Sequence, residues 1–162
     1  RRTSGAQVED QAIELKAMSR LRESVPAEAN VSVTSYNRTA LITGEVPTEA
    51  ARAAAEQTVS RIDNVRATVN ELAIMGSTSV SARGNDSILT SKVKAAFVDA
   101  KDLQANALKV VTERGTVYLM GRVTEREANR AAEVARATSG VGKVVKVFET
   151  ITEAELAALQ SK

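Results

Sequence analysis

The sequence predicts an α+β protein built from two tandem units of the order αββαβ, each a three-stranded mixed sheet with two helices on one face. Two observations support this prediction: the 162-residue chain contains the same pattern twice, and the spacing of apolar residues changes in the same order within each copy. A third observation concerns the core. Aromatic residues make up only 2% of the chain, so each unit must pack mainly Val, Ile, Leu and Ala.

The duplication is visible when the chain is compared with itself. A shift of 77 residues brings Gly44 onto Gly121, and a shift of 76 brings Asp10 onto Asp86. The single-residue slip between the two registers belongs in a loop. We therefore expect one domain over residues 10–74, a Gly- and Ser-containing linker over 75–85, a second domain over 86–151, and a C-terminal helix over 152–162.

Each unit is expected to begin with a helix, because apolar residues recur at helical spacing. They are Ile13, Ala17 and Leu21 in the first copy and Leu89, Val93, Ala96 and Phe97 in the second. Asp10, and the group Asn85-Asp86-Ser87, are expected to cap these helices at their N-termini.

A β-hairpin and a second helix follow in each copy. Two β-rich runs flank a turn at residues 37–38 or 114–115, and the second run places alternate residues on the face that holds the helices. The next helices are expected from Glu49 to about Arg61 and from Glu125 to about Thr138, capped by Thr48 and Thr124.

A short Val-rich run beginning at Val65 or Val141 completes each unit. Because it follows a helical crossover, it is expected to pair in parallel with the strand before that helix. The segment Thr152-Glu153-Ala154-Glu155 has the pattern of a capping box, which predicts a short additional helix at the C-terminus.

The residue types present argue against most enzymes. The chain has no His and no Cys, which excludes a Ser-His-Asp triad, a Cys nucleophile and the usual zinc ligands. Gly44 and Gly121 stand without a phosphate-binding motif, so a bulge or a close contact explains them better. Carboxylates such as Glu113, Glu125 and Glu127 are interpreted as solvated, and we expect no catalytic site, cofactor or metal.

Charge and apolar pattern distinguish the two copies. Residues 10–74 carry a net charge of minus two and residues 83–151 a net charge of plus four. The first helix of the second copy has a second apolar line that its core does not use, flanked by lysines, which is typical of a helix lying at a membrane interface. The candidate lipid-binding residues are Ile88, Leu89, Ser91, Lys92, Lys94, Ala95, Val98 and Lys101.

The corresponding line in the first copy is Ala12, Leu15, Ser19 and Arg22, with Glu14 and Glu23 nearby. An anionic membrane would repel these carboxylates, so only the second copy is expected to contact lipid. The alternative for Ile88 and Val98 is packing against the other domain or the C-terminal helix. No apolar run approaches the roughly 20 residues needed to cross a bilayer.

The repeated unit resembles the BON domain. The resemblance is carried by residues 41–46, LITGEV, and 119–123, LMGRV, each followed by an Ala-rich helix and an Asn-Val or Gly-Val turn. Segments 1–10 and 123–128 also resemble dual-BON outer-membrane lipoproteins of Gram-negative bacteria. The resemblance implies a periplasmic protein, anchored to the outer membrane by a lipid-modified cysteine upstream of Arg1, with roles in envelope integrity and cell division.

The same resemblance implies binding of anionic phospholipids such as phosphatidylglycerol and cardiolipin through the opening helix of the second domain. In those relatives the position of Ile88 is a tryptophan, so insertion could be shallower in this chain. The main alternative is a periplasmic adaptor that binds proteins, such as the outer-membrane assembly machinery. Nucleic-acid binding is not expected, because stacking aromatics and a Gly-x-x-Gly loop are lacking.

Overall fold

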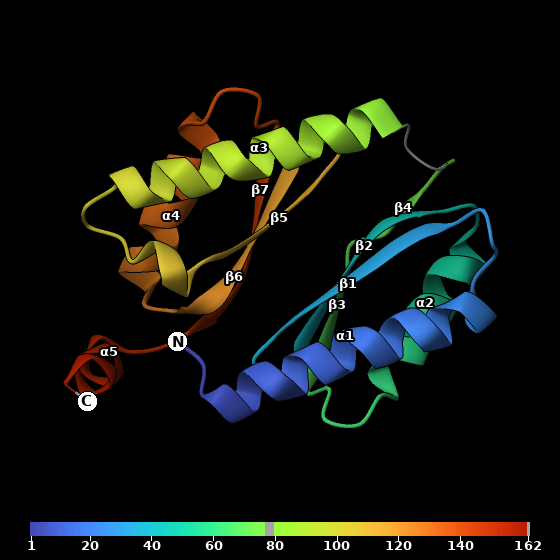
Figure 1. The fold of residues 1–162 in the computed structure, drawn as a ribbon, viewed down its shortest axis with the longest axis horizontal. Coiled ribbons are helices and arrows are strands. Elements are labelled where there is room, and N and C mark those ends of the chain that lie inside the picture. Colours follow the sequence, from blue (N-terminus) through green and yellow to red (C-terminus); the bar gives the residue numbers. More distant parts are fainter. Residues whose placement is uncertain (77–79, 162) are drawn as a thin grey trace. The chain divides into compact units, whose positions relative to one another are not determined.

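The structure, a computed structural model, describes residues 1–76 and 80–161 (Figure 1). The chain divides into two compact units, one within residues 2–79 and the other made of residues 80–162 together with Arg1. Each unit contains a mixed sheet with two helices packed on it, as the sequence predicted, and the second unit adds the C-terminal helix. Each unit has its own hydrophobic core.

The first unit follows the order αββαβ, with its last strand broken in two. Strand β1 pairs antiparallel with β2, and both β3 and β4 pair in parallel with β2. The break between β3 and β4 turns Leu72 into the core, where it is 5% exposed. The elements are α1 (Ser4–Ser24), β1 (Asn30–Tyr36), β2 (Thr39–Val46), α2 (Glu49–Ser60), β3 (Ala67–Asn70) and β4 (Ala73–Ile74).

The second unit has the same order with an unbroken last strand. Its sheet is arranged β5-β6-β7, with an antiparallel β5–β6 pair and a parallel β6–β7 pair. The helices, strands and 3-10 turn are α3 (Val80–Asp99), η1 (Ala105–Ala107), β5 (Lys109–Glu113), β6 (Thr116–Val123), α4 (Glu125–Ala137), β7 (Lys143–Thr150) and α5 (Glu153–Gln160).

Aliphatic side chains make up most of both cores, and the alanines among them allow the helices to approach their sheets closely. In the first unit α1 contributes Ile13, Ala17 and Leu21, and α2 contributes mainly alanines. In the second unit α3 contributes Leu89, Val93 and Phe97. Helices α1 and α2 contact each other, as do α3 and α4, so both helices of a unit lie on the same face of its sheet.

The helix caps confirm several sequence predictions. The Thr48 hydroxyl accepts the Ala51 N–H at 3.1 Å at the start of α2. Thr124 at the start of α4 and Thr152 at the start of α5 each form a complete capping box with the glutamate three residues later. The C-terminal helix therefore exists where its capping pattern predicted it.

The predicted caps at Asp10 and Asp86 were wrong. Helix α1 begins at Ser4, capped by Thr3, and α3 begins at Val80, so both aspartates lie inside helices. Both are buried, at 1% and 8% exposure. The helices extend further toward the N-terminus than the apolar spacing indicated, and α3 includes part of the segment expected to be a linker. Residues 77–79 of that segment lie outside the described residues.

The two strand glycines are structural, as their sequence context favoured. Gly44 has a φ of +119°, and a Cβ there would lie 1.9 Å from the carbonyl oxygen of Asn30. A Cβ on Gly121 would lie 2.5 Å from the carbonyl oxygen of Ala107. Only a glycine permits the neighbouring backbone to approach so closely at these two positions.

Candidate functional site

The outer face of α3 is defined here as Ile88, Ser91, Ala95 and Val98, with the lysines beside it. All four side chains are exposed, Ile88 at 59% and Val98 at 71%. The apolar line that the core does not use therefore faces away from the core, as its spacing predicted. Leu89 does not belong to this face, because it is 7% exposed and packs in the core with Val93.

The hydroxyls of Ser91 on this face and of Ser87 beside it make the surface less polar than the sequence implies. Ser91 Oγ donates to the carbonyl of Ser87 at 3.2 Å, and Ser87 Oγ donates to the carbonyl of Arg83 at 3.2 Å. In such bonds the hydroxyl group donates to a carbonyl of the helix backbone instead of to water. The centre of the face consequently presents methylene and methyl groups more than hydrogen-bond donors.

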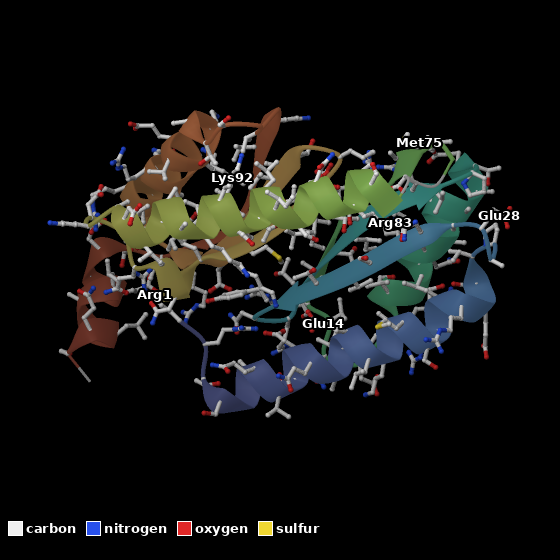
Figure 2. The ribbon with its side chains drawn as sticks, turned by 45° about the horizontal axis from the view of Figure 1, so that its top comes forward. Arg1, Glu14, Glu28, Met75, Arg83 and Lys92 are labelled. Carbon is white, nitrogen blue, oxygen red and sulfur yellow. The ribbon has the colours of Figure 1, made fainter. Side chains whose placement is uncertain are left out.

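Exposed lysines lie on α3 and in the turn that follows it. Lys92, Lys94 and Lys101 are all exposed, and no ion pair involves them among the residues that the structure describes. Figure 2 shows Lys92 on α3. Long lysine stems let the ammonium group remain in water while the helix contacts an apolar phase. The structure thus leaves seven of the eight predicted residues exposed and places Leu89 in the core.

A hollow of about 360 Å³ lies beside the first half of α3. Ile88 and Lys92 contribute to its wall from the helix, Arg114 and Gly115 from the hairpin turn, and Gly140 from the loop after α4. The sequence alone did not indicate this hollow, because residues 114–115 and 140 lie far from α3 along the chain. The sequence shows an arginine at the hairpin turn and lysines on the helix, but only the fold shows that Arg114 and Lys92 border the same hollow.

Asp86 shapes this hollow by holding the hairpin turn. Its carboxylate accepts the N–H of Arg114 at 2.8 Å and the N–H of Gly115 at 3.0 Å. In the first unit Asp10 accepts the N–H groups of Asn37 and Arg38 at 2.7 and 2.8 Å. The repeat therefore uses one buried carboxylate per unit to fix the hairpin on the first helix.

Helix α1 also exposes apolar side chains, more of them than its sequence pattern predicted. Val8, Leu15 and Met18 are 65%, 70% and 53% exposed. Glu14 does not flank this line, because its Oε2 accepts the N–H of Ser35 on β1 at 2.9 Å. The spacing of Val8, Leu15 and Met18 at seven and three residues was the available signal. The two helices consequently resemble each other in apolar exposure more than their sequences implied.

Two kinds of feature, a membrane-spanning helix and a cluster of metal ligands, are absent among the described residues. None of their helices is both long and apolar enough to cross a membrane. No group of three or more acidic side chains among them is placed to hold a metal ion, and the chain has no His or Cys.

The fold and its repeated hairpin define a class of small α+β domains. The sequence model of the BON domain family matches residues 9–76 and again residues 85–152. The chain therefore belongs to the BON domain family. It is a dual-BON protein, as the sequence resemblance indicated.

Two bacterial relatives match more than nine-tenths of this chain. The chain is 36% identical over 151 residues to the outer membrane lipoprotein DolP of Haemophilus influenzae, covering 91% of this chain and 78% of that protein. It is 32% identical over 152 residues to the 21 kDa hemolysin of Actinobacillus pleuropneumoniae, covering 93% and 78%. These names describe a lipoprotein and a hemolysin rather than enzymes.

Among solved structures, the C-terminal domain of CdsD, a structural protein of the type III secretion system of Chlamydia trachomatis, covers 85% of this chain and 96% of its own, with 8% identity and a TM-score of 0.35. This likeness is too distant to support an argument about function.

Proposed function

We propose that this chain is a non-enzymatic protein of the bacterial outer-membrane envelope that docks on anionic phospholipid through the outer face of α3. The observation that carries the proposal is the exposure of Ile88 and Val98 on the helix that also exposes Lys92 and Lys94. The relationship to an outer membrane lipoprotein supports the envelope location. A role in outer-membrane integrity and cell division is part of the proposal. Anchoring by an upstream lipid-modified cysteine is part of the same proposal.

Both parts of the surface contribute to docking energy. Burial of Ile88 and Val98 in the acyl boundary would contribute about 1.5–3 kcal/mol each. Each lysine near an anionic surface contributes about 1 kcal/mol, an attraction that falls off within a Debye length of about 8 Å at physiological salt. Neither contribution alone holds the protein firmly, so docking is reversible and depends on salt.

The hollow beside α3 is the proposed headgroup site. Lys92 and Arg114 border it together with Ile88, so a phosphodiester could sit near two cations while its acyl chains follow the apolar face. Asp86 also borders the hollow, but two backbone N–H groups already bind its carboxylate. We expect phosphatidylglycerol and cardiolipin to bind better than the zwitterionic phosphatidylcholine.

Glutamate at position 88 or 98 is expected to abolish sedimentation with phosphatidylglycerol vesicles. Each change removes an apolar contact with the acyl chains of the membrane and places a carboxylate against an anionic surface. Partitioning should therefore weaken by at least about tenfold. The measurement is vesicle cosedimentation of wild type, Ile88→Glu and Val98→Glu.

The matched control is Leu15→Glu, which makes the same change at an equally exposed position on α1. It should sediment as the wild type does. Retained sedimentation of both α3 variants, or loss of sedimentation for Leu15→Glu alone, would contradict the placement on α3.

A further inference from the structure

A groove of about 410 Å³ lies in the first unit between the end of α1, the loop that follows it, and the first half of β1. Its lining is mostly apolar and includes Met18, Val25, Pro26, Ala29, Val31 and Val33. Met18 is 53% exposed although it borders this groove. All of these residues belong to the first unit, so the groove does not depend on how the two units are placed.

The groove runs along the outer edge of the sheet. Strand β1 is the outer strand of its sheet, and the Ser35 N–H points away from β2 toward Glu14, which Figure 2 labels beside α1. Backbone groups alternate in direction along a strand, so the N–H and C=O groups of Val33 and Val31 also point outward. Among the described residues, no hydrogen bond outside the β1–β2 ladder uses the backbone of Val31 or Val33.

One positively charged side chain, that of Arg22, lies at the border of the groove. Arg22 contributes to its lining, and no ion pair involves Arg22 among the residues that the structure describes. The guanidinium group would pair with a carboxylate brought in by a ligand. The groove therefore offers apolar contacts, outward backbone groups and a positive charge within one short stretch of structure.

In the second unit, core side chains occupy the place that corresponds to this groove. Phe97 occupies the position of Leu21, and Phe97 and Leu103 are 1% and 9% exposed. They pack with Val110 and with the partly buried Leu108, which match Val33 and Val31 of the first unit. The open groove thus distinguishes the first unit from its sibling, although both share one fold.

We propose that this groove binds an extended, partly acidic segment of a partner protein, which adds as a further strand beside β1. In strand addition, backbone hydrogen bonds provide affinity and pockets for alternate side chains provide specificity. Val31 and Val33 bond the incoming backbone, an apolar side chain enters beside Met18 and Val25, and a carboxylate of the segment pairs with Arg22. This inference concerns the first unit and is independent of lipid binding by α3.

The test begins with selection of ten-residue peptides from a random display library on the intact chain, with counter-selection on Met18→Glu. Selected peptides should combine β-branched residues with at least one acidic residue. Titration of a selected peptide into isotope-labelled protein should shift the amide signals of Val31 and Val33 in NMR spectra. Met18→Glu and Arg22→Glu should each weaken its binding by about tenfold, the loss expected for one buried contact or charged pair.

Matched controls lie on the same helix. Leu15→Glu and Arg20→Glu make the same changes at exposed positions outside the groove and should bind the peptide within twofold of wild type. Failure to select any peptide, or amide shifts confined to other strands, would overturn the proposal. A loss of vesicle binding or of self-association in Met18→Glu, without peptide binding to the wild type, would assign the groove to a membrane or to a second copy instead.

Discussion

A single buried aspartate in each unit fixes the hairpin to the first helix. Asp10 is buried, which raises the pKa of its carboxyl, but hydrogen bonds from the Arg38 N–H, the Ser35 hydroxyl, the Arg2 guanidinium and the Asn37 N–H outweigh burial and lower that pKa below its usual value. The ionised form is therefore the one that the folded unit prefers. Because the folded pKa is depressed, this preference stabilises the unit above the unfolded pKa of about 3.9.

The stability of the first unit should fall as the pH drops through that region, since the contribution of Asp10 is lost as the carboxyl becomes protonated. Asp10→Asn should lower the free energy of unfolding near pH 6 by about 1–3 kcal/mol and flatten its decline at acid pH. The measurement is urea unfolding at several pH values, followed by NMR signals of the first unit. Glu56→Gln, at an exposed position on α2, should leave the curve unchanged. An equal acid decline in Asp10→Asn would contradict the assignment.

The sequence predicted the elements better than it predicted the role of these aspartates. Thr48, Thr124 and Thr152 cap helices because the capping bond is local, and local bonds leave a pattern in neighbouring residues. Asp10 bonds residues 27 and 28 positions away, and that partnership has no local pattern. Its only signal was the alignment of Asp10 with Asp86, together with its position one helical turn before the buried Ile13.

At the scale of elements, α3 carries the proposed lipid surface and β1 carries the proposed peptide edge. Periodicity predicted the outer face of α3, because a helix exposes what its core does not use. It could not predict the hollow beside α3, which needs the turn at residues 114–115 and the loop at Gly140 to meet the helix. Periodicity also placed Leu89 on the core line of this helix, and the structure keeps it there rather than among the lipid-facing residues.

The strand glycines allow a direct test of packing within each sheet. Gly44→Ala should destabilise the first unit and Gly121→Ala the second, each by about 2 kcal/mol or more, because the added Cβ would overlap a backbone carbonyl oxygen. Thermal unfolding resolved by NMR signals of each unit would measure the losses. Gly84→Ala is the control: nothing lies within 4 Å of its added Cβ, so this change inside α3 should be neutral or stabilising. Equal stability of all three variants would contradict the close contacts.

At the scale of the whole molecule, duplication has produced two units with one fold and different surfaces. The second unit is cationic and presents an apolar helix face, whereas the first is acidic and leaves a groove open beside its edge strand. Lipid binding by one unit and peptide binding by the other would let the chain hold a partner at a membrane surface. Each role rests on different side chains, so a variant in one unit should leave the other activity intact.

The most direct measurement is line broadening of amide signals by spin-labelled lipid in phosphatidylglycerol bicelles, mapped along the intact chain. We expect broadening to be greatest for Ile88, Ser91, Ala95 and Val98 and to repeat at helical spacing along α3, with much weaker effects on α1. Greatest broadening at Leu15 and Val8 on α1, or no broadening at the outer face of α3 while the protein is bound, would contradict the account.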